Sequence, residues 1–289
     1  MENQTPSQKT TNPLVAHFRQ PKISLSLPSQ GRWWGDGALD LPPNGEIPIY
    51  AMTAKDEIAL RTPDSLLNGT SVVSVVQSCC PNIKDAWQMP SVDLDAVLLA
   101  IRIASFGDVM DIDTNCPECK EDSRFGVKLG DKLAEIECGD YDTPVIVENL
   151  KFGLEPQQYF NVNRIGQIRF QEDRISSLLL DVEMPEAEKG NQLQASFQRL
   201  VDIGIENVTD STAYIEMPDG TKVKNKQHIL EFYTNSSAEV MRKVNERIEA
   251  LTEQMKPAPL KLKCQHCEHI YQSTLEFDYT SFFGIASSS

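Results

Sequence analysis

Two pairs of cysteines are the residues of this sequence best suited to chemistry. Each pair has the spacing C-x-x-C: Cys116 and Cys119 enclose Pro-Glu, and Cys264 and Cys267 enclose Gln-His. A C-x-x-C turn directs both sulfurs inward, and two such turns that face each other form a tetrahedral four-thiolate pocket for zinc. Extended segments flank each pair, such as MDIDTN before the first and LKLK before the second. The pattern predicts two hairpins that meet at their tips, as in a zinc ribbon.

We therefore predict a structural zinc ion with Cys116, Cys119, Cys264 and Cys267 as its ligands. Residues 120–263 separate the pairs, far more than the roughly 15–20 residues usual in such sites. This stretch is therefore predicted to be an insertion whose two ends the metal fastens together. The nearby histidines, His266 and His269, leave a three-Cys, one-His site open as an alternative.

Redox chemistry and catalysis fit the cysteine pairs less well. A thioredoxin-like pair lies at the start of a helix, where the helix dipole lowers a thiol pKa, whereas both pairs here lie between predicted strands. A catalytic zinc keeps an open coordination position, which four thiolates fill. The sequence also lacks an H-E-x-x-H motif, a glycine-rich phosphate loop and an arrangement typical of a Ser-His-Asp triad. We predict no catalytic residues and no enzymatic activity.

Composition limits the class of partner. The 289 residues include 27 Lys and Arg against 42 Asp and Glu, which gives a formal net charge of −15. So acidic a surface repels phosphate backbones and argues against nucleic acid as a ligand. Seven cysteines without a recognisable secretory signal predict synthesis in a reducing cytoplasm. The longest apolar run, AVLLAI at 96–101, is too short to cross a bilayer.

The hydrophobic periodicity predicts an α+β fold. A strand is predicted at 22–27, where apolar and polar residues alternate, and a helix follows Thr53, whose hydroxyl and Asp56 resemble a capping box. A buried, central helix is predicted to be capped by Ser91 and to end at Gly107. Further predictions are helices at 71–80, 156–181, 186–207 and 237–254, a short helix from Thr62-Pro63, and hairpins around Glu148-Asn149 and Pro218-Asp219-Gly220.

These elements predict a mixed core domain with a zinc-ribbon-like element and a mainly helical insertion. The predicted parts are a flexible N-terminal arm (1–20), an α+β core with the zinc ribbon (21–130 plus 258–283), the mainly helical insertion (131–257) and a C-terminal tail (284–289).

Five residues are candidates for contacts with partner proteins. Trp33 and Trp34 lie between glycines in a long loop, where one ring could cover the core or both could form a docking surface. Phe18 and Arg19 lie in the arm and could become ordered against a neighbour. Arg102 is the one basic residue on the buried helix; it could contact a partner, serve as a binding-site cation, or form an internal ion pair with Asp56, Glu57 or Asp64.

Two stretches of the sequence are distinctive, MTAKDEIALRTPDSLLNG and QSCCPNIKDAWQMPSVDLDAVLLAIRIASFGDVMDI, above all at 81–85 and 93–102. In these stretches, and over about residues 12–125 as a whole, the chain resembles the baseplate hub proteins of T-even-like contractile-tailed phages. The opening NPLVAHFRQPKISLSLPS also resembles longer members of this group. Beyond Gly130 the returning C-x-x-C carries most of the resemblance.

The resemblance implies a non-enzymatic virion component that helps to build the central baseplate hub, beside the spike and the tail tube. It implies hub, spike or tail-tube proteins as partners, and a location in the tail baseplate after synthesis in the host cytoplasm. Two alternatives remain open: a hub assembly chaperone absent from the mature virion, and a zinc-ribbon nucleic-acid-binding protein, for which Lys256, Lys261 and Lys263 supply a small basic cluster.

Overall fold

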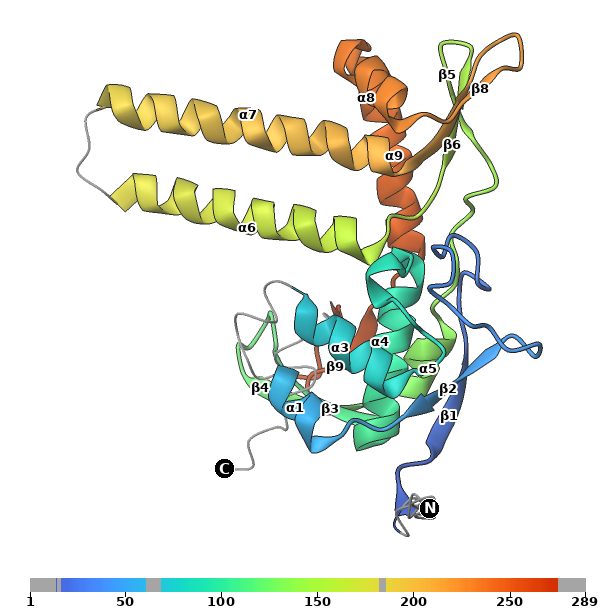
Figure 1. Ribbon diagram of the computed structural model, residues 1–289. Coiled ribbons are helices and arrows are strands. Elements are labelled where there is room, and N and C mark those ends of the chain that lie inside the picture. The colour runs from blue at the N-terminus through green and yellow to red at the C-terminus, as the bar shows by residue number, and fades with distance from the viewer. Residues whose placement is uncertain (1–13, 15–16, 61–68, 182–185, 275–289) are drawn as a thin grey trace, which may run out of the picture.

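The structure is a computed structural model that describes residue 14 and residues 17–60, 69–181 and 186–274. Within these ranges the chain is α+β, as predicted: long helices accompany four small antiparallel sheets. Figure 1 shows a body around α4, a second group of elements around α8 and α9, and two long helices that project side by side. The predicted helix from Thr62, the first part of the N-terminal arm and the C-terminal tail lie outside the described residues.

The body is built around one largely buried helix. Its elements are β1 (Pro21–Ser26), β2 (Glu46–Tyr50), α1 (Ala54–Leu60), α3 (Thr70–Cys79), the 3-10 helix η2 (Ala86–Gln88), α4 (Ser91–Phe106) and α5 (Leu129–Ala134). From Val97 to Ile101 every α4 side chain is at most 2% exposed, because the β1–β2 hairpin and α3 pack around it. This confirms the prediction of a buried central helix. It also places α4 where its first turn can contact several other segments.

The ends of α4 differ from the prediction at one residue. Its N-cap is Pro90, which makes no side-chain cap, so the prediction that Ser91 caps the helix is wrong. Ser91 is the first helical residue, and its N–H donates to the carbonyl of Gln157 at 2.7 Å. At the other end, Gly107 takes φ 92°, a conformation that glycine adopts without a steric cost.

The predicted capping box before α1 is confirmed. The N–H and hydroxyl of Thr53 donate to the Asp56 carboxylate at 2.8 and 2.7 Å, and the N–H of Asp56 approaches the Thr53 hydroxyl at 3.3 Å. These bonds satisfy donors that the start of a helix leaves without intrahelical partners. Asp56 is also buried, so it links the helix start to the body.

A second apolar cluster forms around a four-stranded sheet. The elements are β5 (Val145–Val147), β6 (Leu150–Leu154), β7 (Thr212–Glu216), β8 (Lys222–Val223), α8 (Lys226–Asn235) and α9 (Ala238–Gln254). The strands pair in the order β5-β6-β7-β8, and Phe152, fully buried, stacks on Tyr233 of α8. Both predicted hairpins are confirmed: β5 pairs with β6 around Glu148 and Asn149, whose φ values are 50° and 67°, and β7 pairs with β8 around a turn in which Gly220 takes φ 86°. We call this group the upper lobe.

The two projecting helices are α6 (Tyr159–Asp181) and α7 (Glu186–Asp210). At 1.5 Å per residue, α6 is about 35 Å long. Polar contacts join the pair: Glu172, buried between the helices, accepts from Ser196 at 2.6 Å and from Arg199 at 2.5 and 2.9 Å. Near the root, Arg164 pairs with Glu206 at 2.9 Å. We call this pair the α6–α7 hairpin.

Among the helices of the described chain, none combines the length and the apolar character that crossing a membrane requires.

Candidate metal centre

The structure brings the two cysteine pairs together. The sulfurs of Cys116 and Cys267 lie 3.7 Å apart, those of Cys119 and Cys264 lie 3.6 Å apart, and all four lie within 4.8 Å of one another. Cys116 and Cys264 are buried, whereas Cys267 is exposed. The cluster therefore lies at the edge of the molecule, with its inner half protected from water.

Both pairs use the same backbone turn. The strands are β3 (Val109–Asn115) and β4 (Asp122–Lys128) around the first pair, and β9 (Leu260–Lys263) and β10 (Ile270–Ser273) around the second. Directly after the pairs, Lys120 and Glu268 take φ values of 62° and 61°. Their N–H groups donate back to the carbonyls of Cys116 and Cys264 at 3.0 and 3.2 Å. The matching geometry turns both cysteines of each pair toward the same point.

The distances fit a tetrahedral zinc ion. A Zn–S bond of about 2.3 Å places two sulfurs of a regular tetrahedron about 3.8 Å apart, close to the observed 3.6 and 3.7 Å. A disulfide requires about 2.05 Å, so these contacts are not disulfides. The N–H groups of Cys267 and His266 lower the pKa of the Cys264 thiol to about 6, whereas desolvation and the neighbouring sulfurs raise the pKa of the Cys119 and Cys267 thiols. Without a cation the cluster therefore favours a thiolate at Cys264 first. The donor set is therefore suited to zinc.

Neither histidine joins the cluster. The ring of His266 is 3.2 Å from the carbonyl oxygen of Asp122, and the ring of His269 stacks on Tyr271. Within the described residues, the one group of Cys, His, Asp and Glu side chains close enough to hold a metal ion consists of the four cysteines. The arrangement thus favours four thiolates over the alternative with three cysteines and one histidine.

Contacts beside the cluster join the two hairpins. Leu260 and Leu262 of β9 pack with Val127 of β4, and the hydroxyls of Thr114 and Tyr271 lie 2.6 Å apart. Close to the start of β9, the ammonium of Lys132 donates to the carbonyl of Ala258 at 3.1 Å, and the N–H of Ala258 donates to Glu135 at 3.0 Å. The returning chain is therefore held by α5 as well as by the cysteine cluster.

The two tryptophans of the long loop both contact this chain. The indole N–H of Trp34 donates to the Asp93 carboxylate at 2.8 Å, and its ring packs against the body core. The ring of Trp33 lies between the guanidinium of Arg32 at 4.2 Å and the ring of Tyr141 at 5.3 Å. These contacts indicate that the two tryptophans cover the core, and they do not favour the alternative in which the pair forms a docking surface.

Asp93 is a buried residue that the sequence analysis missed. Its carboxylate, fully buried in the first turn of α4, accepts from the N–H and hydroxyl of Ser29 at 2.8 and 2.5 Å, besides Trp34. Burial raises the pKa of Asp93 to about 6, although the bonds from Ser29 and Trp34 oppose that rise. One feature of the sequence could have indicated a buried carboxylate here: an acidic residue stands among apolar residues at the start of the central helix.

Arg19 is tied to the body. Its guanidinium donates to the carbonyl of Ala51 at 2.6 Å and to the carbonyl and hydroxyl of Ser78 at 2.5 and 2.9 Å, and it lies 3.6 Å from Asp56. It thus joins the end of α3, where carbonyls carry partial negative charge, to the start of α1. Asp56, one of the three acids proposed as an internal partner of Arg102, is therefore paired with Arg19.

Replacing Arg19 by alanine should lower the free energy of unfolding by about 1–3 kcal/mol, because several charge-assisted hydrogen bonds are lost and the buried Asp56 loses its cation. Arg19→Lys should recover only part of this, since an ammonium cannot reproduce the fork of donors. Urea unfolding measures both variants, with Lys22→Ala, an exposed neighbour, as the control. An Arg19→Ala protein as stable as the wild type would instead favour Arg19 as a contact with a partner.

The remaining candidates lie at the surface of the body or near it. The guanidinium of Arg102 lies over the ring of Phe106 at 4.5 Å, and partial burial lowers its pKa. Phe18 is 56% exposed, so its ring remains a candidate for contact with a neighbouring protein.

Comparison with known proteins gives one match. A family model described as T4 bacteriophage base plate protein matches residues 20–284. Neither a search of curated proteins nor a search of solved structures returned a match. The matched range includes the body, the upper lobe, the α6–α7 hairpin and both cysteine pairs. The chain therefore belongs to the T4 bacteriophage base plate protein family.

Proposed function

We propose that this protein is a structural component of the central hub of a phage tail baseplate, acts through protein–protein contacts and carries one structural zinc ion. Membership of the base plate protein family carries this proposal: it makes the chain a structural baseplate component and makes other baseplate proteins its partners. The assignment to the hub rests on the resemblance of residues 12–125 to hub proteins. The family gives no reason to expect an enzyme.

The cysteine cluster supports the zinc ion. Four sulfurs within 4.8 Å, two pairs of them at tetrahedral spacing, would repel one another as thiolates without a cation between them. The metal would fasten the β3–β4 hairpin to the β9–β10 hairpin across the intervening chain. We therefore propose residues 21–130 with 258–283 as the core and 131–257 as its insertion, an arrangement consistent with the separate apolar clusters of body and upper lobe.

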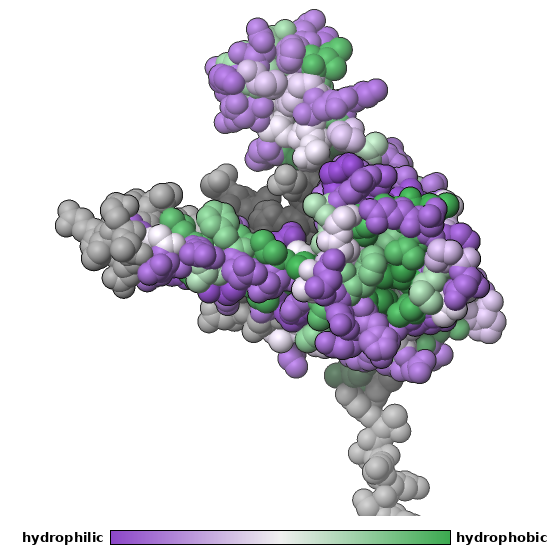
Figure 2. All heavy atoms as spheres, turned by 90° about the horizontal axis from the view of Figure 1, so that it is seen from above, coloured by the Kyte–Doolittle hydropathy of each residue, from purple (hydrophilic) through white to green (hydrophobic). Residues whose placement is uncertain are grey.

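The α6–α7 hairpin supports a function in assembly. Phe170 of α6 and Phe197 and Val201 of α7 are 53%, 66% and 54% exposed. Figure 2 shows hydrophobic residues between hydrophilic ones along this projection. Large apolar side chains on a projecting surface are typical of protein–protein contact sites. The hairpin is thus suited to reach a neighbouring subunit.

Mass spectrometry of purified, washed virions tests the proposal. The expected result is that the protein is present in complete particles and in isolated baseplate hubs, at a constant ratio to the other hub proteins. Absence from virions, together with presence in assembly intermediates, would instead identify an assembly chaperone. Tight binding to DNA or RNA with a steep dependence on salt would contradict both functions.

A further inference from the structure

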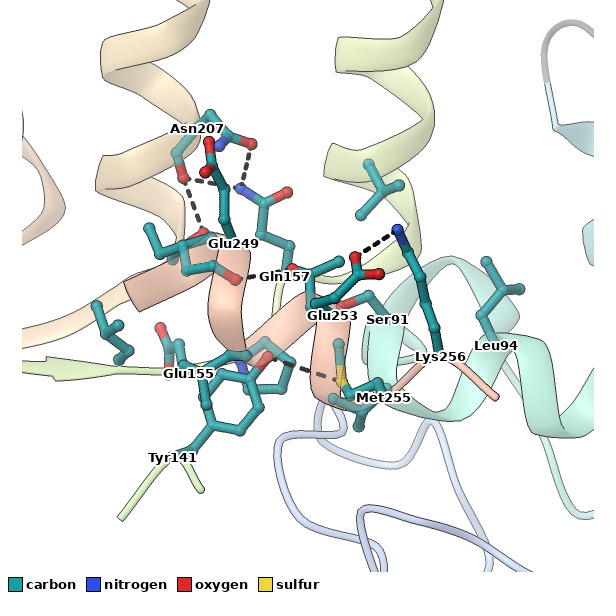
Figure 3. A pocket seen from close by; sticks show the side chains of 18 of the residues that line it. Ser91, Leu94, Tyr141, Glu155, Gln157, Asn207, Glu249, Glu253, Met255 and Lys256 are labelled. Carbon is teal, nitrogen blue, oxygen red and sulfur yellow. Dashed lines mark hydrogen bonds and ion pairs between the residues drawn. The ribbon is translucent and has the colours of Figure 1, made fainter. Parts of the chain in front are cut away.

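A groove opens where the α6–α7 hairpin joins the body. It encloses about 660 Å³ between α6, α9, the first turn of α4 and residues 154–157. Figure 3 shows Ser91 and Leu94 of α4, Glu249 and Glu253 of α9, and Met255 directly after α9 around this space. Cavities of roughly 300–1,000 Å³ hold a drug-sized ligand, so this groove has room for several side chains. We call it the junction groove.

The walls of the junction groove are two helix faces. On α6, Val162, Ile165 and Arg169 line it, and on α9, Ile248 and Thr252 do so. Residues three or four positions apart share one face of a helix, so each helix presents a continuous stripe to the groove. The groove therefore presents apolar and charged positions of two helix faces, which suits a chain segment.

The charges in the groove are unbalanced. It is lined by four acids, Asp95, Glu155, Glu249 and Glu253, and by two bases, Arg169 and Lys256. Glu155 pairs with Lys226 at 2.9 Å, and Glu253 pairs with Lys256 at 2.8 Å. Within the part of the chain that the structure describes, no ion pair within 4.0 Å engages Asp95 or Glu249. The groove therefore offers two carboxylates to an incoming cation.

Asp95 is half-buried, whereas Glu249 and Glu253 are exposed. The desolvation of Asp95 raises its pKa, although the charge of Lys256 partly opposes the rise. Lys256 itself is bonded to Glu253 near the mouth of the groove. A shielded carboxylate without a bonded partner interacts strongly with any cation placed beside it, because the local dielectric is low.

We propose that the junction groove receives a segment of a partner baseplate protein that sets one Lys or Arg side chain against Asp95 and apolar side chains against Val162 and Ile248. A second copy of this chain is a poor occupant, because two chains that each carry a net charge of −15 repel. A basic segment complements both the acidic lining and the charge of the whole molecule. The proposal rests on the proposed function, since it specifies the chemistry of a baseplate contact.

Complementation of a phage that lacks this gene tests the proposal. Asp95→Lys is expected to lower the yield of complete baseplates by about thirtyfold or more, because reversal of a shielded interfacial charge weakens binding at least that much. Asp95→Asn, which keeps the shape, should lower it by about tenfold. Glu231→Lys, the same charge reversal on the exposed face of α8, should leave it unchanged. Zinc content and thermal unfolding of each purified full-length variant report whether it folds.

Suppressors identify the partner. Second-site mutations that restore growth to the Asp95→Lys phage are expected to replace a Lys or Arg of another baseplate protein. Suppressors confined to this chain, for example at Lys256, would overturn the proposal in favour of internal charge balance. Full complementation by a folded Asp95→Lys chain would overturn the proposal as well. If the Asp95→Lys chain does not fold, a wild-type yield of baseplates from Asp95→Asn would overturn the proposal in its place. If omission of the chain leaves baseplates intact, the proposed function itself fails.

Discussion

Replacement of Cys116 by serine is expected to abolish zinc binding and to lower the free energy of unfolding by about 5 kcal/mol or more, since loss of a structural metal is among the largest single-residue effects. Cys116 is fully buried in the cluster. A serine hydroxyl there is a poor zinc ligand, and without the cation the β3–β4 and β9–β10 hairpins keep only a few apolar contacts and hydrogen bonds. Elemental analysis should give about one zinc per wild-type chain and none for the variant.

Two further variants separate the metal from packing. Cys267 is exposed, so Cys267→Ser removes a ligand with little loss of buried area and should still release the zinc. Cys138, which lies outside the cluster and whose thiol donates to the carbonyl of Gly139 at 3.4 Å, supplies the control, because Cys138→Ser should retain the metal. Freshly purified wild-type protein without zinc would contradict the assignment.

Replacement of Asp93 by alanine is the other change with a large expected effect. It removes the acceptor of three donors and leaves the N–H of Ser29 and the indole N–H of Trp34 without their buried partner. We expect the free energy of unfolding to fall by about 2–5 kcal/mol, since each buried, unsatisfied donor costs 1–3 kcal/mol. The loop that carries Trp34 should also become accessible to protease. Asp36→Ala, an exposed acid of the same loop, should change stability by less than about 0.5 kcal/mol.

Asp93 also predicts a dependence of stability on pH. Its folded pKa is about 6 and exceeds the ordinary value of an unfolded aspartate, about 3.9, so between these values the native state binds more protons than the unfolded state. The contribution of Asp93 to stability therefore falls as the pH rises through this window, by about 3 kcal/mol in total. Asp93→Asn does not titrate. Urea unfolding at pH 4.5 and 7 should show the wild type gaining stability relative to Asp93→Asn at the lower pH, and a constant difference would contradict the assignment.

The sequence predicted those features that depend on local pattern. The helix at 71–80 and the two hairpins with positive-φ or Pro-Asp-Gly turns follow from residues that are adjacent in the chain. The cysteine cluster was predictable despite the separation of Cys119 and Cys264, because two identical spacings with extended flanks constrain the geometry more than the length of chain between them.

The features that the sequence did not predict depend on tertiary contacts. Helix α8 (Lys226–Asn235) was missed as a separate element. Asn225 caps it by accepting from the N–H groups of Gln227 and His228, but the helix is short, and its stability comes from the packing of its apolar residues on the sheet, which the sequence does not show. The partners of Asp93 and Arg19 were equally hidden, because Ser29 and Ser78 are distant in sequence. The junction groove lies between segments that are distant in sequence, and hydrophobic periodicity does not show which distant segments pack together.

The cysteine cluster has a consequence for the timing of synthesis. The sulfurs of Cys119 and Cys264 meet across 145 positions of sequence. A ribosome adds about 5–20 residues per second, so the first pair is made roughly 7–30 s before the second. During that interval the nascent chain carries half of the proposed zinc site, and the contacts between the two hairpins cannot form. Metal binding by all four cysteines would thus require that translation has passed the second pair. In a chain whose synthesis stops between the two pairs, the first hairpin would remain without its partner and accessible to proteases.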